Sequence, residues 1–192
     1  EMAEVLVLVD HVDGAVRKST TELLTIARRL GQPSAVFIGE GLDAAVGILT
    51  EFGATTVYQV QMEGVADYLV VPKVEAIAAV VAAVGGAATL AGVLITSGPE
   101  GKEIAGRLAV SLESGLITDA VDVTSVDGAV RTTQSVFAGG FAVTSRITRG
   151  TPIITVKPNS AAPEPVPGAE PPAVVAVPVT LSDTATAARI VE

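Results

Sequence analysis

Five polar residues near the ends of two apolar segments could support catalysis. His11 is the only histidine, and it stands between Asp10 and Asp13 after the first apolar run. A carboxylate–imidazole pair can activate a hydroxyl nucleophile, and Thr96 and Ser97 follow another apolar run in a comparable position. The simpler interpretation of His11 is a hydrogen-bonded turn residue. A single histidine also cannot assemble a metal site without carboxylate ligands. We therefore expect no catalytic residue and no metal-binding residue in this chain.

A second candidate is the turn Gly98–Lys102, which leads from an apolar run into a helical pattern. This is where open α/β sheets bind ligands, and the Gly-Lys pair invites comparison with a phosphate loop. That motif requires glycine where Thr96 stands and a hydroxyl residue where Glu103 stands. A Gly-x-Gly-x-x-Gly pattern is also missing after the first apolar run. A structural turn is favoured, and we expect no cofactor-binding residue.

Composition narrows the classes of partner. The 192 residues include 21 acidic and 12 basic side chains, a net charge of −9, and this sign disfavours nucleic acid. The absence of cysteine excludes disulfides and fits a cytoplasmic protein. Residues 76–99 carry no charge, but Gly85-Gly86 divides this stretch into a helical and a strand-like half. We therefore expect no membrane insertion.

The first part of the chain alternates strand and helix patterns. Continuous apolar runs predict buried parallel strands, and segments of 3.6-residue periodicity predict the helices between them. Ser19 and Glu22 have the spacing of a capping box at the first helix. Pro72 interrupts the third helix early. The predicted strands are 5–9, 34–39, 55–60 and 92–96, and the predicted helices are 19–31, 42–52, 67–84 and 102–112.

After residue 114 the pattern changes to strands joined by turns. Asp127-Gly128 is typical of a two-residue hairpin loop. Gly139-Gly140 could allow close backbone approach, but a tight hairpin turn is the plainer interpretation. The predicted strands are 120–126, 129–137, 141–147 and 153–157. The fold class is therefore α/β, a three-layer sandwich with a mostly parallel twisted sheet and an antiparallel edge or hairpin.

Proline divides the C-terminal part of the sequence. Residues 158–172 carry six of the 11 prolines and predict an extended linker. Residues 173–192 then return to an apolar strand, broken by Pro178, and a polar tail. A strand with proline belongs on an edge, so it either pairs back onto the first domain or begins another. We expect an α/β domain at 1–157, a linker at 158–172, and an edge strand and tail at 173–192.

Several segments, in a fixed order, carry a resemblance to one protein family. They are the strand ending in Asp10-His11, the helix 20–31 with Thr-x-Glu-Leu-Leu, the stretch 96–109 with Thr-Ser-x-x-x-Gly-Lys and Arg-Leu-Ala, Ile117-Thr118-Asp119, and Phe137-Ala138-Gly139-Gly140. Together they resemble the α-subunit family of electron transfer flavoproteins, and the resemblance covers residues 3–157. The family has a Tyr-Ala-Gly-Asn turn where Gly140 replaces asparagine, and often arginine where Gln134 stands.

The resemblance implies a fold related to nucleotide-binding, universal-stress-like domains. It also implies a scaffold that associates with a β-subunit in an electron carrier. That carrier takes electrons from dehydrogenases, such as acyl-CoA dehydrogenases, and passes them to a membrane quinone oxidoreductase. FAD is expected in a C-terminal domain with a Gly-Gly-Arg-Gly-type motif, which this sequence lacks, and AMP in the β-subunit. The alternative is a nucleotide-binding stress-type domain, and a more distant one is a hydrolase using His11.

Overall fold

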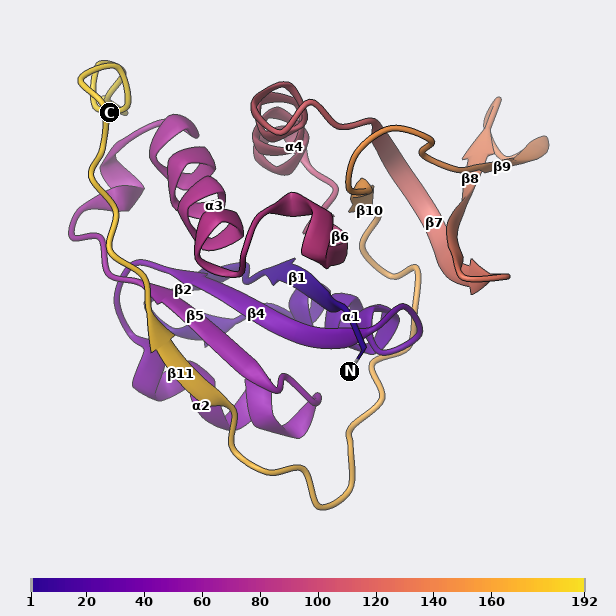
Figure 1. The fold of residues 1–192 in the computed structure, drawn as a ribbon, viewed down its shortest axis with the longest axis horizontal. Coiled ribbons are helices and arrows are strands. Elements are labelled where there is room, and N and C mark those ends of the chain that lie inside the picture. The colour runs from indigo at the N-terminus through magenta and orange to yellow at the C-terminus, as the bar shows by residue number, and fades with distance from the viewer. Residues whose placement is uncertain (1, 192) are drawn as a thin grey trace.

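The computed structural model describes residues 2–191 and contains one nine-stranded sheet, whose parallel part lies between two layers of helices (Figure 1). The strand order is β11-β5-β4-β1-β6-β10-β7-β8-β9. The strands of this sheet are β1 (Glu4–Leu8), β4 (Gln32–Ile38), β5 (Thr56–Val60), β6 (Leu90–Thr96), β7 (Leu116–Val126), β8 (Ala129–Val136), β9 (Phe141–Ser145), β10 (Ile153–Val156) and β11 (Ala173–Ala176). The helices are α1 (Lys18–Ala27), α2 (Leu42–Glu51), α3 (Val71–Ala83) and α4 (Pro99–Ser111). The shorter elements are β2 (His11–Val12), β3 (Ala15–Val16), η1 (Val65–Asp67) and η2 (Ala87–Thr89).

The parallel part of the sheet separates two apolar cores. In β1, Leu6 belongs to the core beneath α3 and α4, whereas Val5 and Val7 belong to the core beneath α1 and α2. Successive side chains point to opposite faces of a strand, so a strand covered on both sides must be apolar throughout. The three-layer α/β arrangement predicted from the apolar runs is confirmed.

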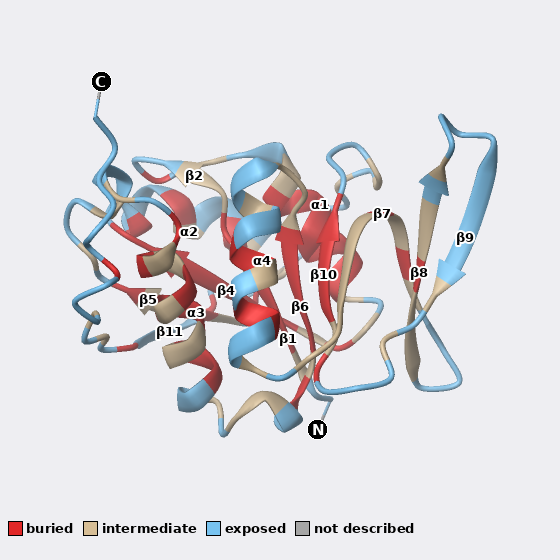
Figure 2. Cartoon of the chain, turned by 90° about the horizontal axis from the view of Figure 1, so that it is seen from above, coloured by how far each residue is buried: buried red, intermediate tan, exposed pale blue. Residues whose placement is uncertain are grey.

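The last part of the sheet is antiparallel and stands away from the helices (Figure 2). Strand β7 pairs in parallel with β10 on one side and antiparallel with β8 on the other, and β8 pairs antiparallel with β9. We call β7–β9, residues 116–145, the antiparallel wing. The predicted two-residue loop Asp127-Gly128 joins Val126 to its cross-strand partner Ala129. The mixed sheet is therefore confirmed.

Three predicted helix starts were wrong. Helix α1 begins at Lys18, and its N-terminus has no side-chain cap, so the capping box does not form. Glu22 is buried instead and accepts a hydrogen bond from the backbone N–H of Asn159 at 2.7 Å. Pro72 lies in the first turn of α3 rather than interrupting a longer helix, and α4 already begins at Pro99. Proline suits a first turn because its missing N–H would have no partner there.

Residues 158–172, here called the proline strap, contain no helix or strand and are bound to the rest of the chain by hydrogen bonds. The backbone N–H of Val166 donates to the carbonyl of Glu51 at 2.8 Å, and that of Glu164 donates to the hydroxyl of Thr25 at 3.0 Å. Arg28, which directly follows α1, donates to the carbonyl of Glu164 at 2.8 Å. The strap then leads into β11, which pairs in parallel with β5 at the sheet edge. Of the two possibilities left open by the sequence, the strand pairs back onto the first domain.

Candidate functional sites

The first candidate site is the carboxyl edge of the sheet between β1 and β6. The chain leaves β1 towards β4 and β5 on one side, and later returns to β6 on the other side, so the strand order reverses here. Ligands of open α/β sheets bind at such a reversal. A cavity of about 430 Å³ lies at this position, bordered by the loops that follow β1, β4, β5 and β6. Its apolar lining comes from Leu8, Ile38, Met62, Val65, Ile95 and Ile104.

His11 lines this cavity as a structural residue. The N–H of Gly14 donates to Nδ1 at 3.2 Å, which leaves the proton on Nε2, and Nε2 lies 2.9 Å from the carbonyl oxygen of Ile38. The ring stacks on Phe37 with a centroid distance of 4.1 Å and an interplanar angle of 14°. Both ring nitrogens are therefore engaged, and the interpretation as a hydrogen-bonded turn residue is favoured over that as a general base.

The carboxylate–imidazole–hydroxyl arrangement, considered as the less favoured alternative, is not assembled. Asp10 forms an ion pair with Arg17 at 3.2 Å rather than bonding the imidazole. Ser97 donates to a carboxylate oxygen of Asp119 at 2.6 Å and accepts a hydrogen bond from the hydroxyl of Thr155 at 3.0 Å. Within the described residues, the hydroxyl of Ser97 is thus engaged by partners other than the imidazole. The hydrolase hypothesis has no geometric support.

Asp119 is the centre of a polar cluster that sequence reasoning missed. Its other carboxylate oxygen accepts from Lys102 at 2.9 Å, and its backbone N–H donates to Thr155 at 3.1 Å. The hydrogen bond from Ser97, and then that from Lys102, lowers the pKa of the Asp119 carboxyl. Asp119 has φ of 58°, close to a register shift between β10 and β7. The cluster joins β6, α4, β10 and β7 at the base of the antiparallel wing.

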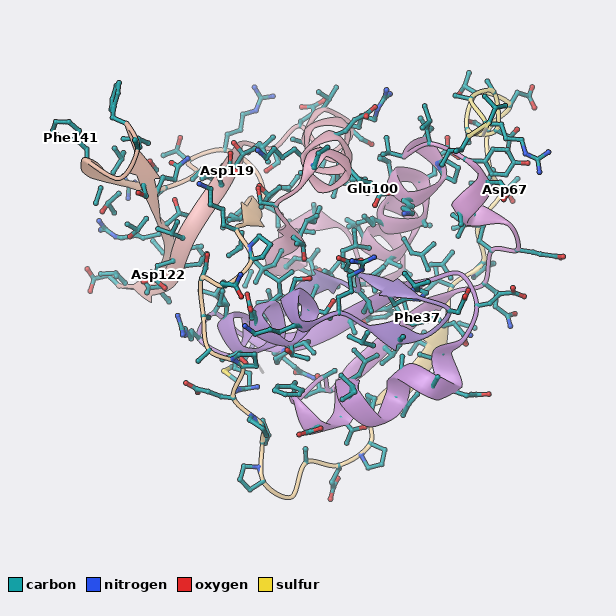
Figure 3. All side chains as sticks on the ribbon, turned by 180° about the vertical axis from the view of Figure 1, so that it is seen from behind. Phe37, Asp67, Glu100, Asp119, Asp122 and Phe141 are labelled. Carbon is teal, nitrogen blue, oxygen red and sulfur yellow. The ribbon has the colours of Figure 1, made fainter. Side chains whose placement is uncertain are left out.

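The turn into α4 does not form a phosphate loop. Lys102 points to Asp119, and Glu100 pairs with Lys73 of α3, between the two helices (Figure 3). A Cβ on Gly101 would lie 2.0 Å from the carbonyl oxygen of Thr96, so this glycine is required where helix and strand approach closely. The structural-turn interpretation of Gly98–Lys102 agrees with this geometry.

The second candidate site is the exposed apolar surface of the antiparallel wing. Phe137 is 83% exposed and Phe141 is 66% exposed, and their rings pack edge to face at 5.9 Å. Val143 on β9 and Val126 at the end of β7 are also exposed. Figure 3 places Phe141 at the outer end of the molecule. Clustered exposed aromatic residues mark interaction surfaces more often than isolated ones do.

The turn 137–140 determines how this surface is presented. The N–H of Gly140 donates to the carbonyl of Phe137 at 3.0 Å, as the tight-turn interpretation of the glycine pair requires. Phe137 and Ala138 adopt φ of 51° and 53°, which is unfavourable for residues with a side chain. Gly139 follows with φ of 87°. The turn therefore holds an exposed phenylalanine in a conformation that such a residue seldom adopts.

Within residues 2–191, no group of three or more carboxylate or imidazole side chains is placed to hold a metal ion. Across the same part of the chain, no helix combines the length and the hydropathy needed to cross a bilayer.

Comparisons with known proteins define the class. The family model described as "Electron transfer flavoprotein domain" matches residues 5–182. This α/β chain therefore belongs to the electron transfer flavoprotein family. It is 42% identical over 186 residues to "Electron transfer flavoprotein subunit alpha" of Mycobacterium tuberculosis (strain ATCC 25618 / H37Rv), a match that covers 96% of this chain and 56% of that protein.

Two other relatives bear the same description. The identity is 41% over 170 residues with the protein of Mycobacterium leprae (strain TN), covering 88% of this chain and 51% of the relative. The identity is 31% over 160 residues with the protein of Syntrophomonas wolfei, and this match covers 82% of this chain and 49% of the relative. The chain thus spans about half the length of the curated relatives it matches.

Proposed function

We propose that this chain is the subunit-association domain of the α-subunit of an electron transfer flavoprotein, and that it binds a β-subunit through the antiparallel wing. The exposed apolar cluster of Phe137, Phe141 and Val143 is the observation that carries the proposal. Similarity to the α-subunits over 96% of the chain supports the assignment of the subunit. In the complete complex the proposed role is to carry electrons in the cytoplasm from dehydrogenases, such as acyl-CoA dehydrogenases, to a membrane quinone oxidoreductase.

The proposal makes the chain a carrier component rather than a catalyst. FAD has two ring systems and a diphosphate, and the cavity of about 430 Å³ at the carboxyl edge does not fit it. Lys73 is the one lysine or arginine among the described residues lining that cavity, and Glu100 already pairs with it. We therefore propose that FAD is held outside residues 1–192, and that AMP belongs to the β-subunit. This chain purified alone is then expected to be colourless.

The association proposal is tested by co-expressing the chain with its cognate β-subunit and measuring the affinity of the purified pair. The variant with Phe137→Ser and Phe141→Ser removes two large apolar side chains, and is expected to weaken binding by at least about tenfold, since exposed aromatic anchors dominate such interfaces. Val110→Ser is the matched control, because Val110 is 82% exposed on α4, outside the wing. It should bind like the unmodified chain. Equal affinity of both variants, or no binding by the unmodified chain, would contradict the proposal.

A further inference from the structure

The cavity at the carboxyl edge has an apolar floor. Ile95 at the end of β6 and Ile104 of α4 are each 1% exposed, and Ile38 at the end of β4 is 5% exposed. Val65 of η1 forms part of the wall. A volume of about 430 Å³ lies within the range of small-molecule sites, which are largely apolar with a few polar groups for orientation. The size and lining suit the ring body of a small organic molecule.

The one lysine or arginine among the described residues that line the cavity is already engaged. The ammonium group of Lys73 pairs with the carboxylate of Glu100. Glu100 also lies in the first turn of α4, where a negative charge complements the partial positive charge of the helix N-terminus. The two ring nitrogens of His11 contact backbone groups. A phosphate or carboxylate entering the cavity would therefore have to displace an existing partner.

The rim of the cavity is acidic. Asp13, in the turn between β2 and β3, and Glu40, in the loop after β4, are exposed. Among residues 2–191 their carboxylates have no hydrogen-bond or ion-pair partner. Carboxylate oxygens accept hydrogen bonds from hydroxyl and amino groups, and they repel anions. From the apolar floor, the engaged ammonium group of Lys73 and the acidic rim, we infer that this cavity binds an uncharged ring compound carrying hydroxyl or amino donors and discriminates against its phosphorylated form.

Adenosine and AMP form a suitable pair of probes, because they share a ring and a sugar and differ by one phosphate. Binding to this chain can be measured by ligand-observed NMR and by calorimetry. Adenosine is expected to bind with a Kd of about 1 mM or tighter, and AMP at least about tenfold more weakly. An absence of adenosine binding at about 5 mM, or AMP binding as tight as that of adenosine, would overturn the inference.

Substitutions at the cavity test whether adenosine binds there. Val65→Trp is expected to fill the cavity and abolish adenosine binding, and unchanged binding would place the ligand elsewhere and refute the inference. The variant with Asp13→Asn and Glu40→Gln is expected to bind adenosine several-fold more weakly and to lose most of the discrimination against AMP. Asp127→Asn is its control, since Asp13 and Asp127 both precede glycine with φ of 49° and 52°. Asp127 lies in the wing, so this control should bind as the unmodified chain does. If the double variant still bound adenosine at least about tenfold more tightly than AMP, the role assigned to Asp13 and Glu40 would be refuted.

The cavity and the antiparallel wing are separate parts of the sheet. The cavity lies between β1 and β6, and the wing begins beyond β10 at the far end of the sheet. Loss of β-subunit binding on substitution of Phe137 and Phe141 should therefore leave the affinity for adenosine unchanged.

Discussion

Replacement of Asp119 is expected to loosen the base of the antiparallel wing. The carboxylate accepts from Ser97 at 2.6 Å and from Lys102 at 2.9 Å, so Asp119→Ala removes both bonds at once. The hydrogen bond from Ser97 is partly buried and contributes about 1–2 kcal/mol, as expected for a bond to a charged group near the surface. In the ion pair, the side chain of Lys102 is 43% exposed and that of Asp119 is 37% exposed, so solvent screening limits the contribution of this pair to stability to about 0.5 kcal/mol.

The backbone adds to this effect. Asp119 has φ of 58°, and alanine in the left-handed region costs about 1 kcal/mol, whereas asparagine tolerates it. The expected loss in free energy of unfolding is therefore about 3 kcal/mol for Asp119→Ala. For Asp119→Asn it is about 1–2 kcal/mol, since the amide keeps one acceptor oxygen and tolerates the backbone conformation.

Urea unfolding followed by circular dichroism measures these losses. Asp122→Ala is the matched control on the same strand, because Asp122 pairs only with the exposed Arg29 at 3.1 Å among its described neighbours. The control should lose at most about 0.5 kcal/mol. If Asp119→Ala and Asp122→Ala were equally stable, the reasoning about the cluster would be refuted.

The same cluster predicts a dependence on pH. The pKa of Asp119 is lowered in the folded state, chiefly by the hydrogen bond from Ser97. A carboxyl group of this kind stabilises the fold fully above its unfolded pKa, about 3.9, and this stabilisation is lost as the pH falls through the lower folded pKa. The stability difference between the unmodified chain and Asp119→Ala should therefore be constant from neutral pH to about pH 5, and should shrink below about pH 4. A difference that grew on acidification would contradict this assignment.

Two further predictions concern packing. Gly101→Ala should destabilise the domain by about 2 kcal/mol or more, because the new Cβ would lie 2.0 Å from the carbonyl oxygen of Thr96. Gly106→Ala on the same helix meets open space and should stabilise the domain by about 0.5–1 kcal/mol. Thermal unfolding measures both variants, and similar effects of the two substitutions would refute the close approach of Gly101 to β6. Arg28→Met removes bonds of 2.6 and 2.8 Å to two backbone carbonyls, at the end of α2 and in the proline strap. Arg28→Met should lower the free energy of unfolding by about 2 kcal/mol and speed limited proteolysis within the strap. Arg29→Met is the control and should not speed this cleavage. Equal cleavage of the two variants would contradict a bound strap.

Local pattern was sufficient for the elements of the fold. Strand β1 is apolar at every central position because its two faces contribute to two different cores, and this appears directly as a continuous run in the sequence. Asp127-Gly128 identified the hairpin because its conformation depends on the two loop residues themselves. The predicted first residues of the helices were less accurate. For α1, the Glu22 carboxylate does not cap the helix start, because it pairs with Lys18 at 3.3 Å and accepts a hydrogen bond from Asn159 of the strap, 137 residues further along the chain.

The sites required information that is not local. Ser97 and Asp119 are 22 residues apart, and they meet because β6, β10 and β7 are neighbours in a particular register. The sequence alone allowed both a catalytic and a structural interpretation of His11. The structure favours the structural one, because Gly14 and Ile38 contact the two ring nitrogens. The cavity between β1 and β6 likewise depends on the order of strands, which alternating patterns do not specify.

By itself, the sequence determined an α/β chain with a parallel sheet, an antiparallel edge and the family to which it is similar. These properties depend on periodicity, turn residues and motif order, all of which are local. Only the tertiary structure decided that the proline strap binds the domain and that β11 completes the sheet. It also decided that the aromatic side chains of the wing remain exposed and that Lys73, which lines the cavity, pairs with Glu100. Those outcomes depend on which distant segments become neighbours, because hydrogen bonds and burial act through space rather than along the chain.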